Sequence, residues 1–384
     1  MKRITHLAIA LCICAGAANA QQTTTGGTTP PATTPPAGGQ QQGNRQQRPP
    51  LVIGEIVTNP DVHDPVMAKQ GDTYYVYYTG SGSWSSQDLV HWKREKPVFD
   101  NTNKPAWLVA AGFPRPGYWA PDIEYLNGQW YIYYSTSAFG KNTSAIGVVT
   151  NKTLDPSSAD YKWVDHGKVI QSYPGKTNWN AIDPNMAVDK KTGDPYLVFG
   201  SFWHGIQLVK LSKDGFSLAN TKDTLANHTV ASRMTDPSAP NPPSIGTHPV
   251  DAGGNAIEGP FIFSKGKYYY LFVSWDYCCS MKNSDYKIAV GRSTSITGPY
   301  LDKKGVDMAK GGGFLLRQGD GKEFYGLGHS GTYTFDGVDY LIYHGYAVTD
   351  ETRVASKLVI EKLNWDKDGW PVIGDRITPP LPKQ

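Results

Sequence analysis

Residues 62–80 read VHDPVMAKQGDTYYVYYTG, and this stretch contains two features that need separate explanations. Its second half has the aromatic and β-branched residues of a strand and ends in a glycine turn. Its first half places His63, Asp64 and Pro65 at the head of an apolar segment, where an unpaired carboxylate is costly to bury. Asp64 therefore either forms a turn or has a chemical task.

The aromatic strand recurs along the chain. Five copies follow glycine turns: GDTYYVYYTG from Gly71, GQWYIYYSTS from Gly128, GDPYLVFGSFW from Gly193, GKYYYLFVSWD from Gly266 and GVDYLIYHGY from Gly337. These glycines are 57, 65, 73 and 71 residues apart. A short apolar strand precedes each copy, and Asn-Gly, Lys-Gly and Asp-Gly steps lie between several of the pairs. Such steps favour β-hairpins, so the chain contains five related hairpins.

The spacing of the hairpins leaves room for two further strands in each repeat. Five blades of four strands, closed into a ring, make a β-propeller. A β-sandwich would not repeat at 57 to 73 residues, and the rungs of a β-helix are much shorter. The 23 tyrosines, 11 tryptophans and 41 glycines also suit a turn-rich β protein. The sequence predicts an all-β, five-bladed β-propeller over residues 51–384.

A polar residue lies just before or at the start of the apolar strand of each hairpin. The five are Asp64 in HDP, Asp122 in APD, Asp183 in IDP, Glu258 in IEGP and His329 in GHSGT. If these strands line the central channel, the five side chains meet at one end of its axis. The alternative is structural, because Asp before Pro is a common turn former that caps its own backbone.

Several carboxyl groups in one pocket favour acid–base chemistry. Like charges close together raise one pKa while another stays low. Glycoside hydrolysis uses such a pair, one group as acid and one as base or nucleophile. Metal binding is the alternative, since hard cations take oxygen ligands, but acids on separate blades match no compact calcium loop.

Aromatic residues flank these acids and favour a sugar, whose C–H faces stack on rings. The flanking rings are Tyr118, Trp119, Phe139, Trp179, Phe202, Trp203, Trp275 and Tyr277. For any one of them, packing between blades is the alternative. Asn180, Ser201 and His204 would supply polar contacts to sugar hydroxyls.

The N-terminal segments predict export. Residues 1–20 carry Lys2 and Arg3, the apolar run LAIALCICAGA and an A-x-A cleavage site, the features of a secretory signal peptide too short to span a bilayer. Residues 21–50 are rich in Thr, Pro and Gln and predict a disordered linker. We expect a secreted or periplasmic protein that leaves the membrane after cleavage. A formal net charge of +3, with both signs scattered, indicates no nucleic-acid partner.

Two of the four cysteines lie in the signal peptide, and Cys278 and Cys279 are adjacent. Neighbouring Cα atoms are about 3.8 Å apart, which is shorter than ordinary disulfide geometry. The pair is either two free thiols or a vicinal disulfide.

The motifs HDP, WAPD, NAIDP and IEGP in this order, with SSQDLVHW after the first hairpin, resemble glycoside hydrolase family 43. NAIDPN followed by GSFWHGI, AFGKNTSAIG and the adjacent cysteines resemble its arabinan endo-1,5-α-L-arabinosidases most closely. The resemblance implies an inverting enzyme with Asp64 as general base, Glu258 as general acid and Asp183 raising the pKa of the acid. It implies a supporting or substrate-contacting role for Asp122. The other candidates for substrate contact are Trp119, Phe139, Gly140, Asn180, Ser201, Phe202 and Trp203. The resemblance also implies a calcium ion in the channel, bound by His329 and water.

The predicted reaction is hydrolysis of internal α-1,5 links in arabinan by a monomer. The alternatives are an exo-acting arabinanase, an α-L-arabinofuranosidase or a β-xylosidase on the same scaffold, and, more remotely, a sugar-binding propeller without catalysis. Exo action needs a blocked cleft, and the Pro- and Ser-rich insertion from Lys222 to Asn255 is a candidate for the blocking wall.

Overall fold

The computed structural model describes residues 52–220, 228–234, 255–348 and 356–381. The predicted signal peptide and linker lie outside these ranges. The described residues form five antiparallel sheets with one short α-helix, α1 (Trp107–Ala110), and two 3₁₀ helices, η2 (Met281–Asn283) and η3 (Met308–Lys310). No helix among them is long and apolar enough to cross a membrane.

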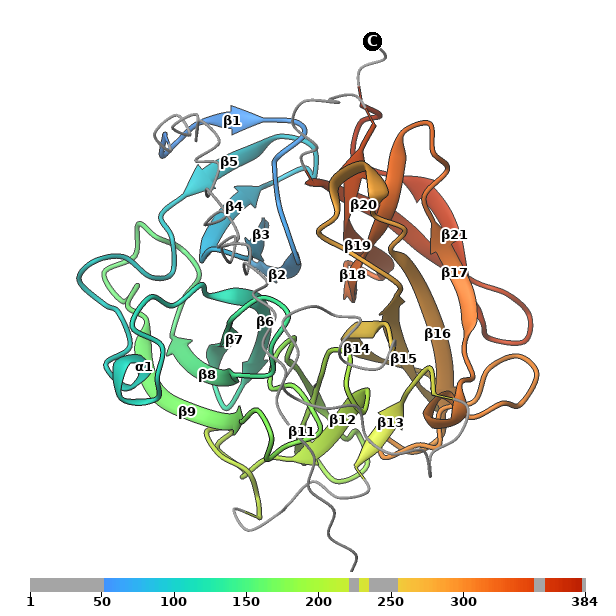
Figure 1. The fold of residues 1–384 in the computed structure, drawn as a ribbon. Helices are drawn as coiled ribbons and strands as arrows, with labels where there is room; N and C mark the ends of the chain where they lie inside the picture. Colours follow the sequence, from blue (N-terminus) through green and yellow to red (C-terminus); the bar gives the residue numbers. More distant parts are fainter. Residues whose placement is uncertain (1–51, 221–227, 235–254, 349–355, 382–384) are drawn as a thin grey trace, which may run out of the picture. The chain divides into compact units, whose positions relative to one another are not determined.

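Each sheet is one blade built from consecutive strands (Figure 1). Blade 1 contains β1 (Ile56–Val57), β2 (Val66–Gln70), β3 (Thr73–Tyr78), β4 (Gly82–Ser86) and β5 (Trp92–Glu95). Blade 2 contains β6 (Trp119–Leu126), β7 (Gln129–Ser137), β8 (Ser144–Asn151) and β9 (Val164–Ser172). Blade 3 contains β10 (Asn185–Val188), β11 (Pro195–Phe199), β12 (Ile206–Lys210) and β13 (Thr229–Ala231).

Blade 4 contains β14 (Ile257–Lys265), β15 (Tyr268–Trp275), β16 (Lys287–Ser293) and β17 (Phe314–Gln318). Blade 5 contains β18 (Phe324–Phe335), β19 (Val338–Ala347), β20 (Ser356–Trp365) and β21 (Pro371–Arg376). The five predicted aromatic strands are β3, β7, β11, β15 and β19, the second strand of every four-stranded unit. Blade 1 departs from the prediction because β1 pairs with β5 and adds a fifth strand.

The first strand of each unit lies at the centre of the ring. Strands β2, β6, β10, β14 and β18 each contact the next, and β18 contacts β2 (Figure 1). This closed order confirms the predicted five-bladed propeller. Because each blade is covered on both faces, some strands are buried along their whole length, as in β8. Large rings such as Tyr77, Trp84 and Tyr343 fill the spaces between sheets.

The ring closes between blades 5 and 1 through a short pairing. The Val62 amide donates to the Ser356 carbonyl at 3.0 Å, and the Leu358 amide donates to the Pro60 carbonyl at 3.1 Å. Lys357 forms an ion pair with Asp61 in the same segment. This pairing fixes the chain immediately before His63 and Asp64.

The predicted insertion from Lys222 to Asn255 is partly a blade strand, because β13 lies within it. Residues 221–227 and 235–254 of the insertion lie outside the described residues. Asn255 is buried and its Nδ2 donates to the Trp203 carbonyl at 2.7 Å.

Candidate active site

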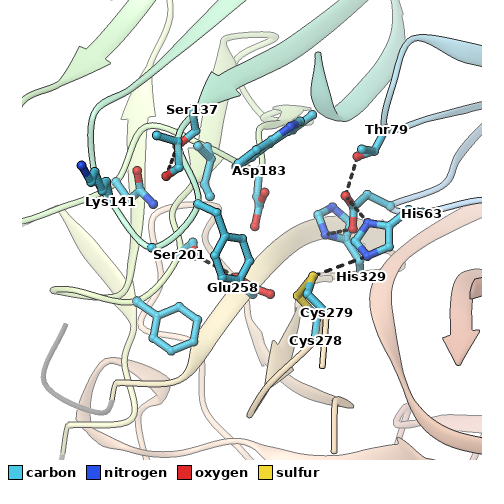
Figure 2. A pocket seen from close by; sticks show the side chains of 18 of the residues that line it. His63, Thr79, Ser137, Lys141, Asp183, Ser201, Glu258, Cys278, Cys279 and His329 are labelled. Atoms are coloured by element: carbon cyan, nitrogen blue, oxygen red, sulfur yellow. Dashed lines mark hydrogen bonds and ion pairs between the residues drawn. A yellow bond between two sulfur atoms is a disulfide. The ribbon is translucent and has the colours of Figure 1, made fainter. Parts of the chain in front are cut away.

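One pocket with a cavity of about 250 Å³ lies where the inner strands β2, β10 and β14 begin. Of the twelve predicted site residues, eleven line it: Asp64, Trp119, Phe139, Gly140, Asn180, Asp183, Ser201, Phe202, Trp203, Glu258 and His329. Figure 2 shows His63, Thr79 and His329 gathered on one side, with Asp183 and Glu258 opposite. Residues from all five blades or their connections therefore meet as predicted.

At or just before the start of each inner strand, one residue in a corresponding place has a left-handed backbone. These residues, which we call the left-handed positions, are Asp64, Ala120, Asp183, Gly259 and His329, with φ of 51°, 39°, 57°, 55° and 51°. A proline follows four of them. In blades 2, 4 and 5 the strand register shifts at this point, as in a β-bulge. Bulges re-aim side chains, and a left-handed non-glycine backbone is strained, which marks these residues as functional candidates.

The left-handed positions correct the sequence alignment of the blades. Asp64, Asp183 and His329 are equivalent, as predicted. Glu258 lies one residue before the left-handed Gly259, and Asp122 lies two residues after the left-handed Ala120. Aligning the blades on their prolines (residues 65, 121, 184 and 260) rather than on their acids would have shown both offsets.

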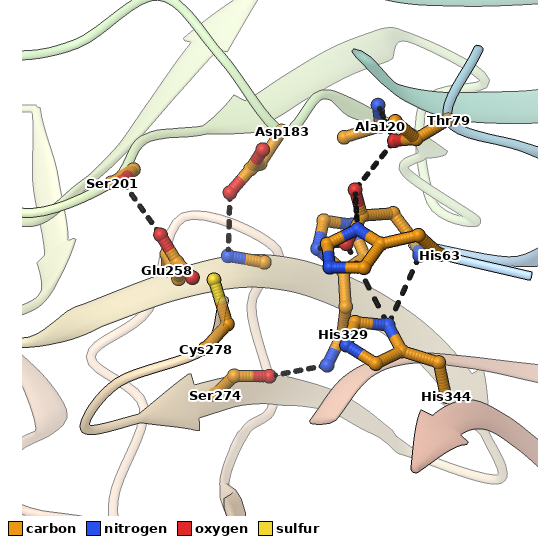
Figure 3. A network of polar contacts seen from close by, with 12 residues as sticks. His63, Thr79, Ala120, Asp183, Ser201, Glu258, Ser274, Cys278, His329 and His344 are labelled. Atoms are coloured by element: carbon orange, nitrogen blue, oxygen red, sulfur yellow. Dashed lines mark hydrogen bonds and ion pairs between the residues drawn. The ribbon is translucent and has the colours of Figure 1, made fainter. Parts of the chain in front are cut away.

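The backbone amide of a left-handed position is bound by a side chain from the second strand of the preceding blade. The Ala120 amide donates to Thr79 Oγ1 at 2.8 Å, the Asp183 amide to Ser135 Oγ at 3.0 Å, the His329 amide to Ser274 Oγ at 2.7 Å and the Asp64 amide to His344 Nδ1 at 3.0 Å. Figure 3 shows the bonds from Ala120 to Thr79 and from His329 to Ser274. Side chains of the preceding blade therefore hold the strained backbone in place.

Blade 4 departs from this arrangement because the equivalent residue of blade 3 is Gly200. A Cβ on Gly200 would lie 2.6 Å from the Gly205 carbonyl oxygen, so a side chain does not fit. The Gly259 amide donates instead to Asp183 Oδ2 at 3.1 Å. The next residue, Ser201, donates to Glu258 Oε2 at 2.8 Å. Because Gly259 directly follows Glu258, the hydrogen bond of the Gly259 amide ties the Asp183 side chain to the backbone of Glu258.

Asp64 lies among several donors. Its Oδ2 accepts hydrogen bonds from His63 Nδ1 at 2.8 Å and Thr79 Oγ1 at 2.5 Å, and its Oδ1 lies 3.0 Å from His329 Nδ1. Burial raises the pKa of Asp64, but the charges and hydrogen bonds of His63 and His329 outweigh burial and hold that pKa well below its usual value. Burial lowers the pKa of His329, yet the Asp64 carboxylate raises it to about 9. Asp64 is therefore ionised in the folded protein.

Glu258 and Asp183 lie in the opposite electrostatic situation. Burial raises the pKa of Glu258, and the hydrogen bond from Ser201 opposes part of this rise. Burial also raises the pKa of Asp183, and the negative charges of Glu258 and Asp64 add to the rise against the opposing charge of His329. One pocket thus holds an ionised carboxylate and a pair that retains a proton, the combination that acid–base catalysis needs.

A family model described as "Glycosyl hydrolases family 43" matches residues 53–371, nearly the whole propeller. The chain belongs to glycosyl hydrolase family 43. It is therefore a glycoside hydrolase, as the order of its motifs predicted.

Relatives within family 43 differ in their mode of action. An extracellular exo-α-(1→5)-L-arabinofuranosidase of Cellvibrio japonicus is 46% identical over 319 residues, covering 82% of this chain and 87% of that protein. An extracellular endo-α-(1→5)-L-arabinanase of Bacillus subtilis is 39% identical over 320 residues, covering 82% and 88%. The crystal structure of an exo-1,5-α-L-arabinanase from a bovine ruminal metagenomic library superposes with a TM-score of 0.73 at 51% identity, covering 83% and 98%.

Aromatic side chains form much of the pocket wall in this family 43 protein. Phe139 is 61% exposed, whereas Phe202 and Trp203 are buried beside Tyr277. Asn180 Oδ1 accepts a hydrogen bond from Ser144 at 2.6 Å. Trp179, one of the flanking rings, packs in the core between blades, and His204 is not among the pocket-lining residues.

Asp122 does not line the pocket, so of its two expected roles the structure fits support and corrects the predicted contact with substrate. Its side chain is fully buried between blades 2 and 3, where Oδ1 accepts from Asn185 Nδ2 at 3.0 Å and Oδ2 accepts from the Met186 amide at 2.7 Å. Burial raises its pKa to about 7. The displacement by two residues from the left-handed position turns this side chain away from the channel, so Asp122 supports the scaffold.

Several pocket residues were not predicted: His63, Thr79, Ser137, Ala138, Lys141 and Ile182. Thr79 and His344 share a signal that was available in the sequence. Each lies four residues after an aligned tyrosine of its aromatic strand, Tyr75 and Tyr340. His63 precedes the left-handed position and bonds Asp64 directly.

Cys278 and Cys279 form a disulfide in the structure, which answers the open alternative of the sequence. The disulfide lines the pocket beside His63. Cys279 Sγ lies 3.6 Å from His63 Nε2, and the Cys279 amide donates to the Tyr346 hydroxyl at 2.9 Å. The pair therefore contacts the residues that surround Asp64.

The donor set around His329 does not make a protein-built calcium site. Calcium takes six to eight oxygen ligands, whereas His329 offers one imidazole, and its Nδ1 faces Asp64. Within the described ranges, no group of three or more His, Cys, Asp or Glu donors includes His329.

Proposed function

We propose that this protein hydrolyses α-1,5-L-arabinofuranosidic links of arabinan. The observation that carries the proposal is the pocket itself, in which Asp64, Asp183 and Glu258 meet beside a wall of aromatic rings. Both relatives and the similar structure bear names that state action on such links.

We infer that Asp64 is the general base and Glu258 the general acid. The low pKa of Asp64 keeps it ionised, so that it takes a proton from the attacking water. The raised pKa of Glu258 keeps it protonated, so that it donates to the leaving oxygen. Asp183 Oδ2 accepts the hydrogen bond of the Gly259 amide and so holds the backbone beside Glu258. Raising the pKa of Glu258, the other role that the resemblance implies for Asp183, is part of the proposal.

Endo action on internal links is the mode that the sequence motifs predict. Exo action is the second candidate, favoured by the higher identities to exo-acting relatives (46% and 51%, against 39%). Product sizing during digestion of linear arabinan distinguishes the two. A spread of oligomers early in the reaction supports endo action, and one small product throughout supports exo action.

The same assay tests the proposed substrate. Release of xylose from xylo-oligosaccharides with no products from linear arabinan would contradict the proposal. Inversion, a further part of it, is tested by recording the anomer formed first in an NMR time course. A product that first appears with retained configuration would exclude the assigned roles of Asp64 and Glu258.

We further propose that the protein is exported and acts as a monomer, and that calcium binds in the channel as the resemblance implies. Export is supported by the extracellular names of both curated relatives. Treatment with a chelator, followed by calcium addition, tests the ion. Loss and recovery of activity or of melting temperature would support calcium, and no change in either would remove it.

A further inference from the structure

His344 occupies the position where three of the other four blades place a hydroxyl residue and the fourth places a glycine. The equivalent residues are Thr79, Ser135, Gly200 and Ser274, each four residues after the aligned aromatic-strand residue. Where a side chain is present it accepts the amide of the next left-handed position. An imidazole occurs at this position in blade 5, next to Asp64.

An imidazole is a less favourable acceptor than a hydroxyl for the hydrogen bond from the Asp64 amide. Its Nδ1 accepts the Asp64 amide at 3.0 Å, which leaves the proton of the neutral ring on Nε2. His344 is fully buried, and Nε2 has no hydrogen-bond partner in the described part of the chain. Because a buried donor without an acceptor destabilises the fold, a serine would serve the backbone bond better. The ring therefore has a use beyond that bond.

The ring face of His344 packs against His63. The two ring centroids are 4.2 Å apart and the planes differ by 25°. His63 Nδ1 donates to Asp64 Oδ2 at 2.8 Å, and His63 Nε2 lies 2.9 Å from the Tyr346 hydroxyl. His344 thus acts on Asp64 in two ways. Its Nδ1 binds the Asp64 backbone amide directly, and its ring packs against His63, which in turn binds the Asp64 carboxylate (Figure 3).

We propose that His344 is a positioning residue for the base Asp64, fixing its backbone through Nδ1 and orienting its carboxylate through the stacked His63 ring. The proposal rests on the assigned role of Asp64. It requires no change in the protonation of His344, since burial first, and then the charge of His63, lowers the pKa of His344 well below its usual value. The effect is geometric.

Two substitutions separate the two contacts. His344→Asn keeps an acceptor for the Asp64 amide without a stacking ring, and His344→Phe keeps the ring without the acceptor. His344→Ala removes both. Misplacement of a reacting group by about 1 Å costs up to about 10²-fold in rate, so we expect kcat of His344→Ala on linear arabinan to fall about 10- to 100-fold, with KM within about twofold. The two partial variants should fall between this variant and the wild type.

Ser274→Ala is the matched control, because it removes the equivalent amide bond beneath His329. A purely structural role predicts equal losses of melting temperature and kcat in Ser274→Ala and His344→Ala. The proposal predicts a larger kcat loss in His344→Ala at a similar melting temperature. Wild-type kcat in His344→Ala, or equal kcat losses in both variants, would overturn it.

A crystal structure of His344→Asn gives a readout that does not depend on the substrate. We expect the His63 ring to be displaced and its bond to Asp64 Oδ2 to be lost. An unchanged His63–Asp64 geometry would overturn the proposal even if arabinan were the wrong substrate. Inactivity of the wild type on arabinan would contradict the proposed function alone.

Discussion

Asp64 and Glu258 lie in one pocket, and their surroundings differ in the charge of the groups that contact them. Asp64 contacts His63 and the Thr79 hydroxyl of its own blade, and His329 across the joint between blades 5 and 1. Glu258 accepts a hydrogen bond from the neutral Ser201 hydroxyl at the joint between blades 3 and 4. Both are buried, yet the pKa falls for one and rises for the other. The comparison shows that the neighbours, rather than the depth of burial, separate the acid from the base.

Removing either carboxyl group should have the largest effect. We expect Asp64→Ala and Glu258→Ala each to lower kcat on linear arabinan by about 10²- to 10⁴-fold, because each removes a proton-transfer group. Asp375→Ala, which alters a carboxylate with 85% of its side chain exposed on β21, is the control and should keep the wild-type rate. Wild-type hydrolysis by both pocket variants would refute the assigned mechanism.

Ser201→Ala should shift the pH profile on one side. Activity requires ionised Asp64, whose pKa is lowered, and protonated Glu258, whose pKa is raised, so activity falls at high pH as Glu258 loses its proton. The Ser201 hydrogen bond stabilises the Glu258 carboxylate. Its removal raises the pKa of Glu258 further, and the alkaline limb of kcat/KM should move to higher pH while the acidic limb stays. A shift to lower pH would contradict this account.

Asp122→Ala should reduce stability more than rate, in contrast to the pocket acids. The variant leaves the Asn185 amide group and the Met186 N–H without their acceptor, at a cost of about 1–3 kcal/mol each in the free energy of unfolding. The stability that protonated Asp122 gives the wild type is complete below the ordinary carboxyl pKa and is lost as pH rises through about 7. Urea unfolding at several pH values measures both effects. Unchanged unfolding with a large loss of kcat would contradict the supporting role of Asp122.

Reduction of the disulfide should have the smallest effect on rate. Denatured, unreduced mature protein should show no titratable thiols, because Cys278 and Cys279 are bonded to each other. Reduction loosens the contacts of Cys279 with His63 and Tyr346, which surround Asp64. Because it leaves both carboxyl groups in place, it should lower kcat less than Asp64→Ala or Glu258→Ala. Two free thiols before reduction would contradict the disulfide.

The fold was predictable from sequence because each aromatic strand carries its own turn signal. The alternation of Gly71, Gly128, Gly193, Gly266 and Gly337 with aromatic strands is local, and local signals survive in a single sequence. The fifth strand of blade 1 was not predictable, since β1 has two residues and depends on pairing with β5.

The site was predictable by residue type more than by geometry. Asp64, Asp183 and His329 were placed at equivalent positions correctly, but one- and two-residue offsets separated Glu258 and Asp122 from them. Such offsets arise from the backbone conformation at the bulges, which the identity of an acidic residue does not reveal. The task of His344 depends on a contact across 280 residues of chain and needed the structure.

The closure of the ring between blades 5 and 1 also has a consequence for which part of the chain completes the pocket. The acid side is complete once blade 4 exists, since Asp183, Ser201 and Glu258 come from the middle of the chain. The base side needs His329, His344 and Tyr346 from the last blade. The last blade is therefore required for the contacts of Asp64 but not for those of Glu258, and removing it should leave the surroundings of the proposed base incomplete.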